Sequence, residues 1–221
     1  MNDQRPEVEW RDGKIPVSSR FDDPYYSLDN GLAETRHVFL AGNDLPARFA
    51  PGFRIAELGF GTGLNMLTAL NAFRAAGCGG QLHFTSFEAY PMRSEDIAAA
   101  LSAFPELDAA VLLGPLRAGK FAFETEDIKV DIIVGDARET LARWAGAADA
   151  WFLDGFSPAK NPEMWEPELM GQVGTHTQPG GTFATYTAAG FVRRGLEAAG
   201  FDVIRSPGFG RKRHMSIGRR L

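Results

Sequence analysis

From residue 53 onward the chain alternates short apolar segments with longer amphipathic ones. Short apolar runs bounded by turn residues are typical of strands, and apolar positions three or four apart are typical of helices. The first pattern predicts strands at 53–59, 82–88, 129–135, 150–154, 181–187, 202–206 and 214–218. The second predicts helices near 64–73, 94–103, 138–145, 163–174 and 189–199.

Strands that alternate with helices form a mostly parallel sheet with helices on its faces. In the first helix, Leu64, Leu67 and Leu70 lie on one stripe, and the glycines from Gly77 onward end it. The last two strands have no helical segment between them, so we expect an antiparallel hairpin. The pattern therefore predicts a Rossmann-like α/β fold with a mostly parallel seven-stranded sheet.

Residues 1–50 do not continue this alternation. The segment 21–27 is aromatic and rich in turn residues, and 31–40 is typical of either a helix or a strand. We expect 1–50 to be an N-terminal cap segment of the same domain, and 51–221 to be the α/β domain itself.

A glycine-rich turn follows the first predicted strand, with glycines at 59, 61 and 63 and an acid, Glu57, two positions earlier. Glycine lets backbone amides and the next helix N-terminus approach a ligand closely. The spacing is G-x-G-x-G, whereas dinucleotide sites use G-x-G-x-x-G to accept a pyrophosphate. Glu57 would repel a pyrophosphate but could bind the ammonium of a methionyl tail, which favours S-adenosylmethionine. Tight strand-to-helix turns also need glycine for purely structural reasons.

Acids also end later strands, where this fold places its ligand. Glu88 ends the second strand and could accept hydrogen bonds from both ribose hydroxyls, and Asp136 ends the third and could reach an adenine amino group. For Asp136, capping the next helix is an equal alternative. We expect the cofactor to be bound by Glu57, Gly59, Phe60, Gly61, Thr62, Gly63, Asn65, Glu88, Asp136 and Asp154.

Asp154 follows the fourth strand and begins an Asp-Gly turn. Methyl transfer to nitrogen needs a neutral amine, so a carboxylate that orients the amine and accepts its proton is valuable. We therefore expect Asp154 to be the catalytic residue; the alternative is a turn with no chemistry. Phe156, Lys160 and Trp165 follow in a loop that could wall a substrate pocket, although Trp165 is equally suited to core packing.

Charge is uneven along the 221 residues, whose net charge is -5. Cations concentrate near the C-terminus, which is typical either of a solvated surface or of a phosphate-binding face. The candidate RNA-binding cations are Arg193, Arg194, Arg211, Lys212 and Arg213.

Other features exclude several classes of protein. The single cysteine, Cys78, argues against disulfides, and the scattered histidines argue against a metal site. The absence of a long apolar run argues against a membrane span and secretion, so we expect a cytoplasmic protein.

Longer motifs resemble the methyltransferase domain of the MnmC family, over about residues 8–218. They are the segments 21–31, 34–40, 59–65, 149–162, 190–196 and 208–213, of which 149–162 and 208–213 are the most specific. The resemblance implies a class I S-adenosylmethionine-dependent methyltransferase fold. It also implies methylation of the 5-aminomethyl group of the tRNA wobble uridine, giving 5-methylaminomethyl-2-thiouridine. In many relatives a flavin-dependent oxidoreductase domain, which acts on the preceding step, follows this one.

Other functions fit parts of the pattern. A small-molecule amine methyltransferase or an aminopropyltransferase would share the fold and a sulfonium cofactor, but neither explains the basic C-terminal segment. A non-catalytic RNA-binding domain would explain that segment, but not the acids at four strand ends.

Overall fold

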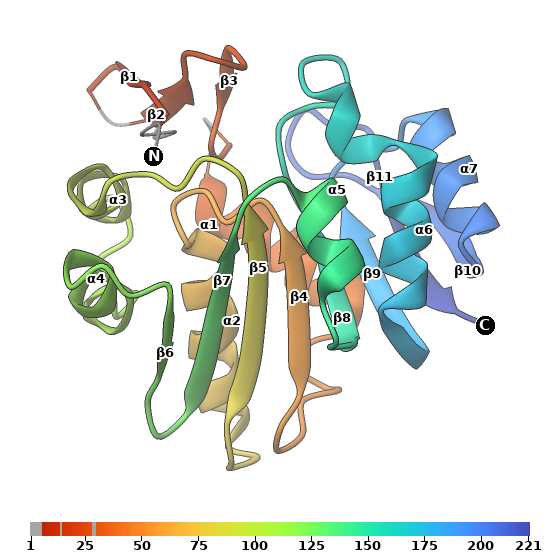
Figure 1. Ribbon diagram of the computed structural model, residues 1–221, viewed down its shortest axis with the longest axis horizontal. Coiled ribbons are helices and arrows are strands. Elements are labelled where there is room, and N and C mark those ends of the chain that lie inside the picture. Colours follow the sequence, from red (N-terminus) through yellow and green to blue (C-terminus); the bar gives the residue numbers. More distant parts are fainter. Residues whose placement is uncertain (1–5, 14, 28–29) are drawn as a thin grey trace.

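The computed structural model describes residues 6–13, 15–27 and 30–221 (Figure 1). Residues 28 and 29 of the motif 21–31 lie outside the described residues. The described chain holds an eight-stranded sheet in the order β10-β11-β9-β8-β4-β5-β7-β6. Its strands are β4 (Arg54–Leu58), β5 (Leu82–Glu88), β6 (Ala122–Glu124), β7 (Ile128–Val134), β8 (Ala148–Leu153), β9 (Thr177–Thr185), β10 (Phe201–Pro207) and β11 (His214–Arg220).

The predicted α/β fold is confirmed, and each of the seven predicted strands exists. β4, β5, β7, β8 and β9 run parallel, and β10 and β11 form the expected antiparallel hairpin. The strand count was wrong by one, because β6 pairs antiparallel to β7 and forms the edge of the sheet. β6 has only three residues and two of them are exposed, so it carries too little apolar pattern to be recognised.

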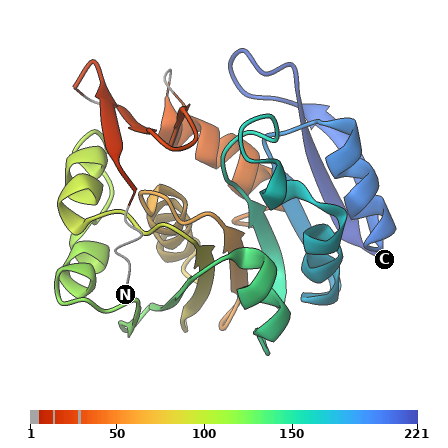
Figure 2. The ribbon, with the colours of Figure 1, turned by 45° about the horizontal axis from the view of Figure 1, so that its top comes forward.

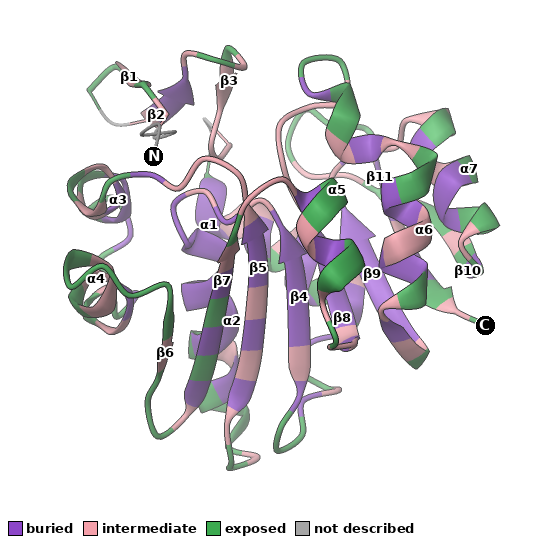
Figure 3. Cartoon of the chain, in the orientation of Figure 1, coloured by how far each residue is buried: buried purple, intermediate pink, exposed green. Residues whose placement is uncertain are grey.

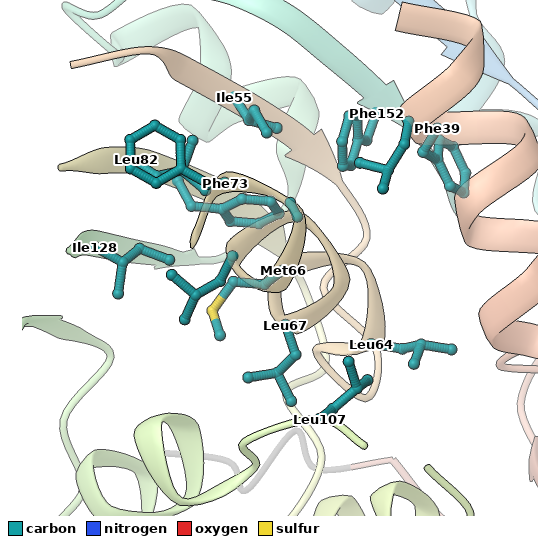
Figure 4. Close-up of a cluster of buried hydrophobic side chains, with 14 of the residues drawn as sticks. Phe39, Ile55, Leu64, Met66, Leu67, Phe73, Leu82, Leu107, Ile128 and Phe152 are labelled. Atoms are coloured by element: carbon teal, nitrogen blue, oxygen red, sulfur yellow. The ribbon is translucent and has the colours of Figure 1, made fainter. Parts of the chain in front are cut away.

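Helices cover both faces of the sheet (Figures 1 and 3). One face packs against α1 (Gly31–Thr35), α2 (Leu64–Ala76), α3 (Ser94–Leu101) and α4 (Ala110–Arg117), and the other against α5 (Ala137–Thr140), α6 (Pro167–Thr175) and α7 (Gly190–Ala198). In Figure 4 the side chains of Met66 and Phe73 lie between α2 and the strands, and Phe39 lies beside Phe152. α4 was not predicted, because Gly114 and Pro115 interrupt its helical pattern.

Strand alternation decides which residues face α2. Successive side chains of a strand point to opposite faces, and in β4 Ile55 belongs to the core on the α2 side whereas Ala56 and Leu58 belong to the other core. Glu57 shares the parity of Ile55. Its carboxylate therefore points to the face of the sheet that α2 covers, where it accepts a hydrogen bond from Asn65.

Residues 6–13 and 15–24 lie across the carboxyl ends of the strands (Figure 2). β1 (Val8–Arg11), β2 (Ile15–Ser18) and β3 (Asp23–Pro24) form a small antiparallel sheet there. After α1 the chain continues through the helical turns Arg36–Leu40 and Ala41–Asn43. The buried Asn43 donates to the Trp151 carbonyl and accepts from Thr182, which ties this segment to β8 and β9. The division of this one domain into a cap segment at 1–50 and the α/β part at 51–221 stays a prediction.

Among the described residues, no helix is both long enough and apolar enough to span a bilayer.

Candidate active site

A cavity of about 620 Å³ opens at the carboxyl ends of the parallel strands. Its walls come from the glycine turn, from the ends of β5, β7 and β8, from residues 20–35 and from the loop before β11. The volume lies within the range of small-molecule and cofactor sites. Within the described part of the chain, His, Cys, Asp and Glu form no cluster that could hold a metal ion.

The glycine turn joins β4 to α2. Gly61 lines the cavity with φ +54°, and a Cβ there would meet the Tyr25 ring at 3.3 Å. Gly63 caps the N-terminus of α2 with φ +75°, does not line the cavity, and could not carry a Cβ without overlapping Leu112. Gly61 therefore belongs to the cavity wall, whereas Gly63 is required for packing. Gly59, Phe60, Thr62 and Asn65 also line the cavity, as do Glu88, Asp136 and Asp154.

The amide of Asn65 connects two carboxylates. Its Nδ2 donates to Glu57 Oε1 at 2.9 Å and to Asp154 Oδ2 at 2.8 Å. Its Oδ1 accepts from the Thr35 hydroxyl at 2.8 Å. Ser86 donates to the second oxygen of Glu57 at 2.7 Å. Each polar atom of the Asn65 side chain thus has a partner, and the carboxylate of Asp154 is held at the cavity wall.

Glu57, which we expected to bind the cofactor directly or through water, lies behind the cavity wall. Glu57 is fully buried and does not line the cavity. β4 directs its side chain toward α2, beneath the turn, where Ser86 and Asn65 satisfy it. Burial raises the pKa of Glu57 well above its ordinary value, and the hydrogen bonds from Ser86 and Asn65 oppose that shift. Glu57 therefore supports the turn from below.

Asp154 is the carboxylate of this network that faces the cavity. Burial raises its pKa from 3.8 to about 6, against the hydrogen bonds that it accepts from Gly155 N–H and Asn65. The charge of Glu34 raises this pKa further, and that of Lys212 lowers it. A carboxylate with a pKa near 6 is ionised at neutral pH and is a better proton acceptor than an ordinary aspartate.

Glu88 and Asp136 both line the cavity, but each also has a local structural role. Glu88 accepts from Gly61 N–H at 3.1 Å and from Tyr90 N–H at 2.8 Å, so it braces the glycine turn against the end of β5. Burial raises the pKa of Glu88. Asp136 caps α5 and forms an ion pair with Arg138 at 2.6 Å, which lowers its pKa. The capping role foreseen for Asp136 is therefore present, at the cavity wall.

The loop after β8 lines the cavity at one of the three predicted positions, and Trp165 takes the core-packing alternative. Phe156 lines the cavity and stacks on Phe21 with ring centroids 4.7 Å apart. Lys160 lies outside the cavity and pairs with Asp22 at 2.7 Å, which fastens the loop to the N-terminal segment. Trp165 is 1% exposed and packs in the core, and its indole donates to the Phe156 carbonyl at 3.0 Å. The last two residues hold the loop and do not wall the cavity.

The C-terminal cations are not brought together at one place. Arg211 and Lys212 line the cavity, whereas Arg193, Arg194 and Arg213 do not. Lys212 turns inward and pairs with Glu34 at 2.9 Å. The Lys212 side chain is nevertheless 45% exposed, and its expected contact with phosphate stays a prediction. Arg211 and Arg213 are exposed on the loop between β10 and β11.

Several cavity residues had no predicted role. Tyr186 directly follows β9, so the strand-end rule that identified Asp154 would have found it. Glu34 and Tyr25 lie in the motifs shared with the MnmC family, but no local pattern relates residues 25–35 to the glycine turn. Thr35 is likewise known as part of the site only from its hydrogen bond to Asn65.

Comparison with known proteins gives a family match. A family described as S-adenosyl-L-methionine-dependent methyltransferase matches residues 100–220, which is a little over half of the chain. The chain is also similar to the proteins named tRNA 5-methylaminomethyl-2-thiouridine biosynthesis bifunctional protein MnmC from two bacteria. For Chromohalobacter salexigens the identity is 47% over 96% of this chain and 33% of the relative. For Caulobacter vibrioides it is 49% over 92% of this chain and 36% of the relative.

The chain thus spans about a third of the length of the curated relatives that it matches. Among solved structures it is similar to MNMC2 from Aquifex aeolicus, with a TM-score of 0.78 and 25% identity over 96% of this chain and 70% of that chain. These matches confirm the resemblance to the MnmC methyltransferase domain.

The cofactor in that family description fits the cavity. S-adenosylmethionine combines an adenosine with an amino-acid tail, and the cavity has the volume of a cofactor site together with acids from three strand ends. The wall at Gly61 lacks a side chain where a Cβ would project toward Tyr25, which leaves backbone exposed to a ligand.

We therefore predict that Gly61→Leu removes S-adenosylmethionine binding while the protein stays folded, because the new side chain fills the cavity wall. A matched control is Gly77→Leu, which meets the same unfavourable backbone region at φ +63° with nothing within 4 Å of its Cβ. Calorimetry should show an affinity for Gly77→Leu close to that of the native protein, with both variants losing similar thermal stability. Native affinity in Gly61→Leu, or tight NAD binding by the native protein, would contradict this location of the cofactor.

Proposed function

The chain belongs to the S-adenosyl-L-methionine-dependent methyltransferase family, and from that premise we propose that it methylates the 5-aminomethyl nitrogen of the tRNA wobble uridine. The observation that carries this proposal is Asp154, a carboxylate at the cavity wall with a pKa raised to about 6. An acceptor that enters as an ammonium needs such a proton acceptor. The names of the relatives at 44–49% identity point to the same modified nucleoside.

In this proposal the strand ends hold the cofactor. Glu88 would accept from the ribose hydroxyls, Asp136 would contact the adenine, and the backbone of Gly59 and Gly61 would contact the methionyl part. When bound, S-adenosylmethionine supplies a methyl group on a positively charged sulfur, which becomes neutral when the methyl leaves. Glu57 acts only through Asn65, which it helps to hold in place.

Asp154 acts on the acceptor. Its ionised carboxylate attracts the aminomethyl ammonium and orients its nitrogen toward the methyl carbon. One N–H proton passes to a carboxylate oxygen of Asp154, and the freed lone pair forms the new N–C bond. Asn65 and the Gly155 N–H keep the carboxylate in one orientation during this transfer.

We propose tRNA as the substrate carrier on one structural ground besides the names of the relatives. Arg211 is exposed at the mouth of the cavity, and Arg213 is exposed on the same loop. Guanidinium groups at that place suit the phosphates of an anticodon stem. The relatives are bifunctional by name, and we propose that a flavin-dependent oxidoreductase, as a partner or a further domain, supplies the aminomethyl group in the cytoplasm.

The proposal is tested by incubating the protein with methyl-labelled S-adenosylmethionine and tRNA that carries 5-aminomethyl-2-thiouridine, followed by nucleoside analysis. Label should enter 5-methylaminomethyl-2-thiouridine. Equal turnover of the free nucleoside and the tRNA would favour the small-molecule methyltransferase. Cofactor binding without transfer to either acceptor would favour the non-catalytic alternative.

Asp154→Ala should lower kcat by about 100-fold or more, which is the usual contribution of a positioned acid or base. The native kcat/KM should fall below pH 6, because protonation then removes the ionised form of Asp154, whose pKa is about 6. The residual activity of Asp154→Ala should instead rise steadily with pH, because only solution deprotonation of an amine with a pKa of about 10 then supplies the nucleophile. If kcat/KM of Asp154→Ala still fell below pH 6, that fall would belong to a group other than Asp154.

The double substitution Arg211→Ser with Arg213→Ser should raise the KM for tRNA about tenfold and flatten its dependence on salt, because each lost phosphate contact removes counterion release. The affinity for S-adenosylmethionine should not change. Arg117→Ser with Arg205→Ser removes the same charge from exposed positions outside the cavity and serves as the control. Identical kinetics and salt slopes for both pairs would show that this loop does not bind RNA.

A further inference from the structure

One corner of the cavity holds an ammonium group that belongs to the protein itself. The Lys212 Nζ atom lies 2.9 Å from Glu34 Oε1 and 3.9 Å from the centroid of the Tyr186 ring. The Glu34 side chain is 13% exposed, whereas that of Lys212 is 45% exposed. A carboxylate and an aromatic face are the two groups that bind an alkylammonium best, so this corner is a formed ammonium site.

The three residues come from separate elements. Glu34 is on α1, Tyr186 follows β9, and Lys212 is on the loop between β10 and β11. The Tyr186 hydroxyl donates to the Gly155 carbonyl at 2.7 Å, which fixes the ring beside the Asp154 turn. Glu34 and Tyr186 are thus part of the folded cavity wall, whereas Lys212 reaches in from an exposed loop.

Three carboxylates act on the Tyr186 hydroxyl in this corner. The carboxylates of Asp154, Asp23 and Glu34 each raise the pKa of the Tyr186 hydroxyl, after burial as the largest cause, so all three lie within electrostatic reach of it. Lys212 is the ammonium in contact with this ring. The corner is therefore suited to a cation, and the turn that carries Asp154 lies beside it, since the Tyr186 hydroxyl donates to the Gly155 carbonyl.

We propose that Glu34 and the ring of Tyr186 bind the ammonium group of the methyl acceptor, and that Lys212 occupies the same site in competition with it. The side chain of lysine ends in a methylene and a primary ammonium, as the 5-aminomethyl group does. The inference rests on the proposed function only in taking a primary amine as the acceptor. It makes Glu34 and Tyr186 determinants of acceptor specificity.

This competition has consequences for the acceptor. A primary ammonium can replace Lys212 at Glu34 without leaving a buried carboxylate uncompensated, whereas a hydroxyl of the same size cannot. Displacement also moves the Lys212 charge outward, next to Arg211, where it would face tRNA phosphates. Acceptor entry and tRNA contact are thereby coupled through one side chain.

The test uses two substitutions that break the same ion pair. Lys212→Met removes the competitor and leaves Glu34 unpaired, so the affinity for propylammonium chloride should rise about tenfold, as expected for one exchanged ion pair near an aromatic face. Glu34→Gln removes the carboxylate, so the same affinity should fall about tenfold. Binding is followed by NMR shifts of the protein with S-adenosylmethionine present, and propanol is the neutral control ligand. Arg205→Met, an exposed cation outside the cavity, controls for net charge.

Opposite shifts in the two variants would support the site. Shifts in the same direction, or none, would overturn it, because a purely structural ion pair predicts equal losses of stability and no gain in amine affinity.

In the tRNA assay, Glu34→Gln should raise KM for tRNA carrying 5-aminomethyluridine more than it lowers kcat. Tyr186→Phe should keep propylammonium affinity and Tyr186→Leu should lose it, since the ring face is what binds. Propylammonium binding does not depend on tRNA, so opposite shifts without tRNA methylation would refute the tRNA assignment alone.

Discussion

The amide of Asn65 is the interaction on which the site depends. Two carboxylates lie on either side of it, Glu57 beneath the glycine turn and Asp154 at the cavity wall, and one amide nitrogen donates to both. Without that donor the two would face each other across a buried space, where like charges repel and unpaired groups are costly. Thr35 holds the other end of the amide, which links α1 to the same centre.

This arrangement explains why the site is both rigid and reactive. Every partner in the chain from Ser86 through Glu57 and Asn65 to Asp154 is a hydrogen-bonding side chain. A fully satisfied buried network specifies one geometry, whereas a partly satisfied one does not. Burial still raises the pKa of Asp154 to about 6, so the rigid carboxylate keeps a useful proton affinity near neutral pH. The N-terminal segment and the loop after β8 then close the cavity through contacts such as that of Asp23 with Ser157 N–H at 2.8 Å.

The sequence predicted the strand ends well and the tertiary contacts poorly. Glu88, Asp136 and Asp154 reach the cavity because parallel strands bring their carboxyl ends to one edge, which can be read from the chain. From the sequence we expected Glu57 to bind the cofactor. Alternation along a strand shows which side chains share a face, but it does not show which of the two faces packs against α2. The ion pairs of Lys160 with Asp22 and of Lys212 with Glu34 were not predicted for another reason, because the partners are remote in sequence. Ion pairs and packing between distant segments leave no periodic signal.

Burial and Asn65 together set the proton affinity of Asp154, and a carbon-13 NMR titration of the Asp154 carboxyl measures that affinity. In the native protein the midpoint should lie near pH 6, and in Asn65→Ala it should move higher, because the amide donor that favours the ionised form is lost. Asn71→Ala, at an exposed position of α2, should leave it unchanged. A native midpoint near 4, or an identical midpoint in Asn65→Ala, would contradict the account.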